Sequence, residues 1–339
     1  MSRAERKIDH IRHALSHSKS ERSYFDDIDI VHQSLTAQNW EDLQLKTNVG
    51  ELNLSSPLFV NAMTGGGGKK TEEINQSLAE AAKRTGIGMA VGSQMSAIKN
   101  KEERSTYEVV RKANPDGVIF ANVGSEATLD QAKEAVDMIE ANALQIHLNT
   151  LQELIMPEGD RDFRMRLKHI EAIVQGLHVP VIIKEVGYGV SKETANQLYD
   201  LGVRHIDVGG SGGTNFSKVE NLRRNDPMIS FENWGIPTPV SIVEVSKQVP
   251  DVHVIASGGI RNGLDGVKSL LLGADAFGMA GSLLKVMIEE GQEALVSKIE
   301  HIHREIKMAM MLLDIDHVKD FNGKPHVIRG DMKNWIDQR

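Results

Sequence analysis

Residues 143–153 read Ala143-Leu144-Gln145-Ile146-His147-Leu148-Asn149-Thr150-Leu151-Gln152-Glu153. The first four residues are mostly apolar and indicate a buried strand. The end of the stretch carries an imidazole, two carboxamides and a carboxylate. In a barrel of parallel strands, chemistry takes place at the carboxyl ends of the strands. The stretch therefore predicts a strand followed by a polar site that suits an anion and a hard metal ion.

Short apolar runs alternate with amphipathic segments from residue 58 onward. The helix-like segments are 71–84, 129–141, 161–175, 192–201, 241–248 and 262–272, and the predicted strands are 58–62, 88–92, 118–123, 144–149, 181–186, 205–209, 252–257 and 276–280. This count predicts a single (β/α)8 TIM barrel of the α/β class, with an open doubly wound sheet as the alternative. We expect an N-terminal arm or cap at 1–57, the barrel core at 58–292, and a C-terminal helix and tail at 293–339.

Composition excludes several classes of protein. The formal net charge of −8 argues against general affinity for nucleic acid. The chain has no cysteine, which excludes disulfides and a thiol nucleophile and fits a cytoplasmic protein. The charged segment 1–12 lacks the apolar core of a signal peptide, and no apolar run approaches the length of a membrane span.

Glycines gather after the last three predicted strands, at residues 209–214, 257–261 and 279–282. Glycine lets backbone N–H groups approach an anion closely, and a following helix N-terminus adds partial positive charge. Loops after strands seven and eight form the recurrent phosphate site of barrel enzymes. Tight turns alone would also use glycine. The three clusters together favour a ligand that bears a phosphate.

Small and polar residues also end the first three strands. Residues 61–66 read Asn61-Ala62-Met63-Thr64-Gly65-Gly66 and leave room for a flat ring whose edge the backbone can bind. Ser93 and Gln94 follow the second strand, and Asn122 lies at a matching depth at the end of the third strand. Lys184 lies within an apolar strand, where a buried ammonium requires a partner. A cofactor carbonyl, an anionic ring nitrogen or a phosphate would serve.

Each of these polar groups also has a structural interpretation. Lys184 could simply pair with a carboxylate such as Glu185 or Asp207. Glu153 suits Mg²⁺, which takes one or two carboxylates and completes its shell with water and phosphates, but it could also be a solvent-facing loop carboxylate. The basic pair Arg6-Lys7 could belong to a solvated helix start, or to an arm that reaches phosphate oxygens.

The connection after the sixth strand is unusually long. Residues 211–237 are mostly polar, with glycines at the strand end and charges in the middle. Such a length suits a lid that closes on a ligand, or a flexible surface loop.

With these residues in view, the chain resembles the type 2 isopentenyl-diphosphate isomerases, which are flavin-dependent barrel enzymes. The likeness spans essentially the whole chain. It rests on the segments Arg6-Lys7-x-Asp9-His10-Ile11, Ala62-Met63-Thr64-Gly65-Gly66, Gly92-Ser93-Gln94, His147-Leu148-Asn149-x-x-Gln152-Glu153, Lys184-Glu185-Val186-Gly187, Gly212-Gly213-Thr214-Asn215, Gly258-Gly259-Ile260-Arg261 and Ala280-Gly281. The 147–153 segment and the N-terminal arm are the specific part, since other flavin barrels share the glycine motifs.

The resemblance implies FMN, Mg²⁺ and a reduced nicotinamide, taken as NADPH, that keeps the flavin reduced. It implies His147 and Gln152 as catalytic residues and Glu153 as the metal ligand. Substrate contacts would come from Arg6, Lys7, Ser93, Gln94, His147, Asn149 and Gln152. FMN contacts would come from Ala62, Met63, Thr64, Ser93, Asn122, Lys184, Thr214, Gly258, Gly259, Ile260, Arg261, Ala280 and Gly281. The family usually carries serine where this chain has Gly209, so one hydroxyl contact to FMN would be missing or shifted to Ser211. A homo-oligomer, a tetramer or octamer, is expected.

The implied reaction turns isopentenyl diphosphate into dimethylallyl diphosphate, adding a proton at one end of an allylic system and removing one from the other. An alkene is a poor base, so a well-placed acid is required. With no cysteine in the chain, reduced FMN becomes the expected acid–base group, and the protein positions and desolvates. One alternative is another FMN barrel that oxidises a phosphorylated or 2-hydroxy-acid substrate, and another is a non-catalytic flavin or phosphate binder.

Overall fold

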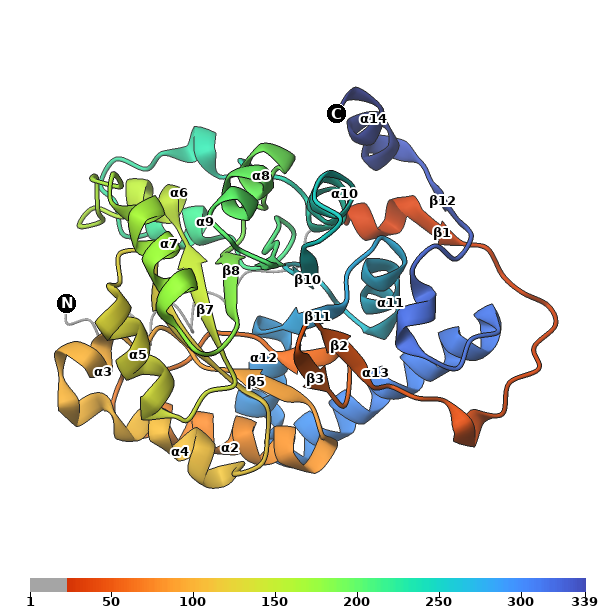
Figure 1. Ribbon diagram of the computed structural model, residues 1–339, viewed down its shortest axis with the longest axis horizontal. Coiled ribbons are helices and arrows are strands. Elements are labelled where there is room, and N and C mark those ends of the chain that lie inside the picture. The colour runs from red at the N-terminus through yellow and green to blue at the C-terminus, as the bar shows by residue number, and fades with distance from the viewer. Residues whose placement is uncertain (1–22) are drawn as a thin grey trace.

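The computed structural model describes residues 23–339 (Figure 1). Eight parallel strands form a closed barrel in the order β10-β11-β4-β5-β6-β7-β8-β9. These strands are β4 Leu58–Val60, β5 Gly88–Ala90, β6 Ile119–Gly124, β7 Ala143–Leu148, β8 Val181–Glu185, β9 His205–Asp207, β10 His253–Ser257 and β11 Ala276–Met279. Every predicted strand overlaps one of them, so the expected TIM barrel is confirmed.

Helices surround the barrel and follow its strands. They are α2 Lys69–Thr85, α3 Met95–Lys99, α4 Ser105–Ala113, α5 Leu129–Met138, α6 Thr150–Ile155, α7 Arg166–Gly176, α8 Lys192–Asp200, α9 Phe216–Asn221, α10 Thr238–Gln248, α11 Gly263–Leu271, α12 Gly281–Glu290, α13 Gln292–Leu313 and α14 Gly330–Gln338. Several begin at residues whose side chain accepts a backbone N–H of the first turn, as Thr128 does for α5, Ser191 for α8 and Asn262 for α11. Such caps end the loops and start the helices at fixed points.

A hairpin closes the lower end of the barrel. Strands β2 Thr47–Val49 and β3 Leu52–Leu54 pair antiparallel, and their buried apolar side chains join a cluster with residues at the start of the barrel strands, including Phe59, Phe120 and Ile182. The amino ends of the strands are therefore filled by hydrophobic packing. The opposite, carboxyl end carries the polar side chains.

The first described segment of the chain and its last segment lie together outside the barrel (Figure 1). Strand β1 Ile28–Ile30 pairs antiparallel with β12 His326–Ile328, and the short 3-10 helix η1 Tyr24–Asp27 packs against α14. Two further 3-10 turns, η2 Trp40–Asp42 and η5 Val318–Phe321, complete this region, and η3 Lys101–Glu103 precedes α4.

The connection after β9 is more ordered than a plain loop. It contains α9 and the 3-10 helix η4 Ile229–Phe231, and Val219 and Glu220 of α9 are buried. Asn215 caps α9 and also donates from Nδ2 to the carbonyl of Glu232 at 2.6 Å. The connection thus folds back on itself and onto the barrel. Within residues 23–339, the structure contains no helix that is both long and apolar enough to cross a membrane.

Candidate functional site

A buried ion pair lies at the carboxyl end of the barrel. The ammonium of Lys184, on β8, lies 3.0 Å from the carboxylate of Asp207, on β9. Asp207 is fully buried and Lys184 is 8% exposed. Lys184 also donates to the hydroxyl of Ser257 at 2.9 Å, and that hydroxyl donates to Asp207 at 2.5 Å. Pairing with Asp207, one of the two carboxylates considered from the sequence, therefore satisfies the buried lysine.

Three carboxamides extend this polar layer across the barrel. Asn61 donates from Nδ2 to Asp207 at 2.8 Å, and its Oδ1 accepts from Gln145 at 3.2 Å. Gln145 in turn accepts from Asn122 Nδ2 at 3.2 Å, and Asn122 Oδ1 lies 3.0 Å from Nδ1 of His147. A continuous chain of hydrogen bonds therefore joins the carboxylate to the imidazole. Gln145 could not be recognised from the sequence as a site residue, because it lies in a strand that is otherwise apolar.

Helix α6 brings the other residues of the 147–153 segment to the same end of the barrel. Asn149 donates to Glu153 Oε1 at 2.8 Å, and the backbone N–H of Asp160 donates to Glu153 Oε2 at 2.8 Å. The side chain of Arg166 donates to Asn149 Oδ1 at 3.3 Å. Both carboxylate oxygens of Glu153 are thus held in place, next to the strand end that carries His147.

Glu220 is a site residue that sequence reasoning placed only among the charges of the long connection. It is fully buried, and its carboxylate accepts from Gln152 Nε2 at 3.0 Å and from Arg223 at 2.6 Å. Because Nε2 of Gln152 donates to Glu220, the orientation of the amide is fixed and Oε1 points away from Glu220. Arg223 also binds Glu158. The contact links α9 to α6, as a lid over the site would require.

Glu185 follows Lys184 and has an unusual environment. Its carboxylate accepts from the backbone N–H groups of Gly187 at 2.8 Å and Tyr188 at 2.5 Å. Burial nevertheless dominates and raises the pKa of Glu185 to about 7, because the surrounding protein disfavours the charged form. A carboxyl group that exchanges its proton near neutrality thus lies beside the polar layer.

The glycine clusters form a close-packed cradle. A Cβ on Gly258 would lie 2.1 Å from the carbonyl oxygen of Gly210, and one on Gly259 would lie 2.6 Å from the backbone of Gly212. Gly258 and Gly259 also have φ values of +96° and +74°, which favour glycine. The loops after β9 and β10 can therefore approach each other only with glycines.

The N-terminus of α12 completes this cradle. The helix begins at Gly281, its N-cap residue Ala280 has no side-chain oxygen, and a Cβ on Gly281 would lie 3.6 Å from Met63 and from Thr214. Backbone N–H groups at such a helix start suit a phosphate. Residues of the loops after β4 and β9 therefore lie next to the start of α12, which follows β11.

The structure explains why Gly209 is not a serine in this backbone. Gly209 has a φ of +43°, and a Cβ there would lie 1.7 Å from the carbonyl oxygen of Glu185. A side chain would require the backbone to move. The hydroxyl that the family usually carries is therefore excluded by geometry here.

The end of β4 is fixed against β5 and α2. Thr64 donates from its hydroxyl to Asn75 at 2.5 Å, and its carbonyl accepts from Gly92 N at 2.7 Å. The carbonyl of Ser93 accepts from the hydroxyl of Tyr107 at 2.5 Å. Ala62, Met63 and Ser93 are partly exposed, whereas Thr64 is buried. These contacts set the position of the predicted ring-binding segment.

Gln94 differs from its predicted role as a substrate contact. It is fully buried, its amide donates to the carbonyl of Ala135 at 2.8 Å, and its Oε1 accepts from the backbone N–H of Asn122 at 3.0 Å. Both ends of the amide are used within the protein. Gln94 thus joins the end of β5 to β6 and α5, and the structure gives it no surface toward a ligand.

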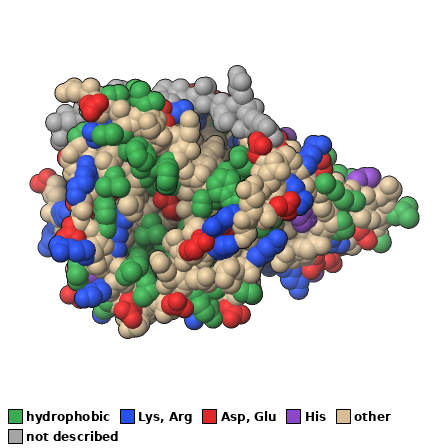
Figure 2. All heavy atoms as spheres, turned by 90° about the horizontal axis from the view of Figure 1, so that it is seen from above, with side chains coloured by type: hydrophobic (Ala, Val, Ile, Leu, Met, Phe, Trp, Pro, Cys, Tyr) green, Lys and Arg blue, Asp and Glu red, His purple; other side chains and the backbone are tan. Residues whose placement is uncertain are grey.

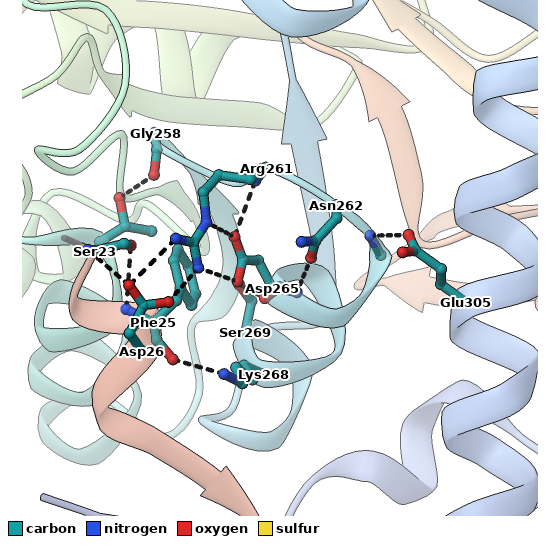
Figure 3. A network of polar contacts seen from close by, with 12 residues as sticks. Ser23, Phe25, Asp26, Gly258, Arg261, Asn262, Asp265, Lys268, Ser269 and Glu305 are labelled. Atoms are coloured by element: carbon teal, nitrogen blue, oxygen red, sulfur yellow. Dashed lines mark hydrogen bonds and ion pairs between the residues drawn. The ribbon is translucent and has the colours of Figure 1, made fainter. Parts of the chain in front are cut away.

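Arg261 also lies in a different setting from the predicted cofactor contact (Figure 3). Its guanidinium binds Asp265 at 2.6 Å and Asp26 at 2.6 Å. The arginine holds the pKa of Asp26 at about 2, mainly through these hydrogen bonds. The side chain therefore ties η1 to the start of α11. Two of the predicted substrate contacts, Arg6 and Lys7, lie outside the described residues.

Figure 2 looks onto the molecule from above in the view of Figure 1, where α6 and α9 follow the carboxyl ends of β7 and β9. Hydrophobic side chains gather on the left half of this face. The connection after β9 carries exposed apolar residues, with Ile229 at 65% and Trp234 at 63%. Exposed apolar side chains on this connection would suit a ligand that has an apolar part.

Comparisons with known proteins agree with this geometry. Residues 99–329 match the model of the FMN-dependent dehydrogenase family. A protein of Geobacillus sp. named isopentenyl-diphosphate delta-isomerase is 57% identical over 339 residues, which cover 100% of this chain and 97% of that protein. A Bacillus licheniformis protein of the same name is 53% identical, with 100% and 97% covered.

Solved structures show the same fold at low sequence identity. A mandelate oxidase with (S)-2-phenylpropionate superposes with a TM-score of 0.66 at 16% identity, covering 96% of this chain and 98% of that one. Such an identity speaks for the barrel alone. The family match and the near full-length relatives show that the chain belongs to the FMN-dependent dehydrogenase family and is an enzyme of the type 2 isopentenyl-diphosphate delta-isomerases.

Proposed function

We propose that this enzyme converts isopentenyl diphosphate to dimethylallyl diphosphate on a reduced FMN, with Mg²⁺ holding the diphosphate and NADPH serving only to keep the flavin reduced. The observation that carries the proposal is the polar layer. It places a buried ammonium, Lys184, and an imidazole, His147, in register on neighbouring strands at the mouth of a barrel. Its support is the family and the names of the relatives.

The residues present fit FMN. The phosphate would lie on the glycine cradle, against Gly258, Gly259, Ile260 and the α12 start at Ala280 and Gly281, with Thr214 beside it. The ring would be held by Lys184, Asn122, Ala62, Met63, Thr64 and Ser93. The Lys184 ammonium, held by Asp207, would meet the part of the ring that carries negative charge on reduction. When bound, reduced FMN supplies the acid–base group that transposes the double bond.

The protein's own residues bind, orient and exclude water. His147 and Asn149 would hold the diphosphate, and Gln152, whose amide is oriented by Glu220, would orient the substrate or relay a proton. The apolar side chains of the connection after β9 would help to desolvate the isoprenyl group.

Mg²⁺ would bind the Glu153 carboxylate and bridge to the diphosphate. Glu153 has both oxygens directed by hydrogen bonds, which suits a ligand held in place before the metal arrives. Among the residues from 23 onward, the one cluster of three His or acidic side chains close enough to hold an ion is Asp316, His317 and Asp320, in the C-terminal segment. A single carboxylate completed by water and phosphate oxygens is the arrangement that Mg²⁺ commonly takes.

The test is proton NMR of isopentenyl diphosphate in deuterium oxide, with the purified protein, FMN, Mg²⁺ and NADPH, under anaerobic conditions. The proposal expects dimethylallyl diphosphate with deuterium incorporated, and only while FMN is reduced. A Gln152→Leu variant should keep FMN and diphosphate binding but lose conversion. No conversion by protein that holds reduced FMN would reject the proposal and favour a redox enzyme, to be tested by flavin reduction with 2-hydroxy acids.

A further inference from the structure

We infer that Asp207 is a positioning residue for His147, acting through Asn61, Gln145 and Asn122, and that this relay keeps the neutral imidazole protonated on Nδ1. The inference rests on the proposed function only where it concerns the diphosphate. The relay itself follows from the donors and acceptors in the polar layer.

The relay starts at the Asp207 carboxylate, which can only accept hydrogen bonds. Asp207 accepts from four donors: Lys184 Nζ at 3.0 Å, Asn61 Nδ2 at 2.8 Å, Ser257 Oγ at 2.5 Å and the backbone N–H of Gly209 at 3.2 Å. A carboxylate has no proton to donate and about four acceptor positions. All of them are used, so Asn61 must direct its NH₂ group toward Asp207.

A backbone group fixes Asn61 a second time. The N–H of Ala62 donates to Asn61 Oδ1 at 2.8 Å, and a backbone N–H can only donate. Oδ1 therefore faces Gln145, whose amide must donate from Nε2 to it. Gln145 is fully buried and Asn122 is 2% exposed, so water does not compete for these groups.

The orientation then passes to the imidazole. Gln145 Oε1 accepts from Asn122 Nδ2, which leaves Asn122 Oδ1 as the atom 3.0 Å from His147 Nδ1. Two acceptors cannot share a hydrogen bond, so Nδ1 carries the proton. In the neutral ring the lone pair is then on Nε2, the nitrogen turned away from Asn122.

This tautomer has a consequence for an anionic ligand. Diphosphate oxygens accept hydrogen bonds, and a neutral ring with its proton on Nδ1 cannot donate to them from Nε2. His147 can bind the diphosphate only as the imidazolium, so binding takes up a proton. Lys184 lies in register with His147 on the next strand, where its ammonium is paired with Asp207.

Charged groups of both signs lie on the elements around His147. Glu126 lies against Gly124, the residue in register with His147 on β6. Glu153 on α6 and Arg166 on α7 lie beyond Asn149, to which both are hydrogen-bonded. These charged groups do not touch the relay, so they do not choose its tautomer.

The tautomer can be read directly by magic-angle-spinning ¹⁵N NMR of the full protein labelled at histidine, with His147 assigned from the spectrum of a His147→Gln variant. At a pH where the ring is neutral, we expect protonated Nδ1 and unprotonated Nε2. Gln145→Met, which interrupts the relay with a side chain of similar size, should introduce the Nε2-protonated form. Ser257→Ala, which contacts Asp207 off the path to His147, should leave the tautomer unchanged.

Proton uptake gives the second readout, with inorganic pyrophosphate as the probe. Calorimetry in two buffers of different ionisation enthalpy should show more protons taken up by wild type than by His147→Gln, by up to about one proton per site. A wild-type ring protonated on Nε2, an unchanged tautomer in Gln145→Met, or equal uptake in the two proteins would overturn the inference. The relay found intact in a protein that fails to isomerise would reject the proposed function alone.

Discussion

Replacing Asp207 with asparagine should destabilise the FMN-free protein by about 3 kcal/mol. Asp207 is fully buried and is the counter-charge of the Lys184 ammonium, which is itself 8% exposed. An asparagine would turn one of the two acceptor oxygens into a donor facing other donors. Removing one partner of a buried ion pair typically costs about 3–5 kcal/mol. The hydroxyl of Ser257 and the carbonyl of Glu185 still accept from Lys184, so we expect the lower end of that range.

The assay is chemical denaturation of four proteins: wild type, Asp207→Asn, Lys184→Met and the double variant. Each single change leaves an unpaired buried group, whereas the double variant leaves neither charge. The double variant should therefore be more stable than the sum of the two losses predicts, by about 2–3 kcal/mol. Ser257→Ala is the matched control, since it removes one neutral contact to the same carboxylate and should cost about 1 kcal/mol.

The reasoning would be refuted by either of two results. If Asp207→Asn lost less than about 1 kcal/mol, the buried carboxylate would not be an obligate counter-charge. If the two single losses were additive, Lys184 and Asp207 would not interact as an ion pair in the folded protein.

Three further predictions concern the rest of the site. Glu220→Gln should lower kcat by roughly 10- to 100-fold with little change in KM, because the charged acceptor that orients Gln152 is lost, and unchanged kcat would contradict this. Burial raises the pKa of Glu185 from 4.5 to about 7, so the folded apo-protein keeps a proton that the unfolded chain releases, and stability should fall by roughly 3 kcal/mol as the pH rises through that window. Denaturation at pH 5 and pH 8 should show this loss in wild type and not in Glu185→Gln. Gly258→Ala should cost about 2–5 kcal/mol of stability and weaken FMN binding, because the added Cβ would lie 2.1 Å from the carbonyl oxygen of Gly210 at a φ of +96°. The control is Gly323→Ala, which has a φ of +79° but open space around it and should cost only about 1–2 kcal/mol. Equal losses of stability for the two variants in melting experiments would show that the clash at Gly258 is relieved.

The sequence was sufficient for the barrel because each strand is a short, nearly continuous apolar run, and parallel strands covered on both sides have that pattern. It also placed residues 147–153 and the glycine clusters at the carboxyl ends of strands, because both follow apolar runs in the sequence. The role of Gln145 could not be found this way, because the sequence around one polar residue in an apolar strand does not indicate which residues it contacts.

Arg261, Gln94 and Glu220 show the other limit of sequence reasoning. Arg261 binds Asp26, which is 235 positions away, and Gln94 is held by Ala135 of α5. Glu220 lies in a polar stretch and becomes buried only when α9 packs on α6. Each depends on a tertiary contact that leaves no local periodicity.

The β2–β3 hairpin closes the amino end of the barrel. Val49, Leu52 and Leu54 pack against the barrel core, so ligands reach and leave the polar layer from the carboxyl end. If FMN lies on that layer as proposed, the substrate would cover its one open side. The substrate or product would then leave before the flavin, and the flavin should dissociate more slowly while the site is occupied.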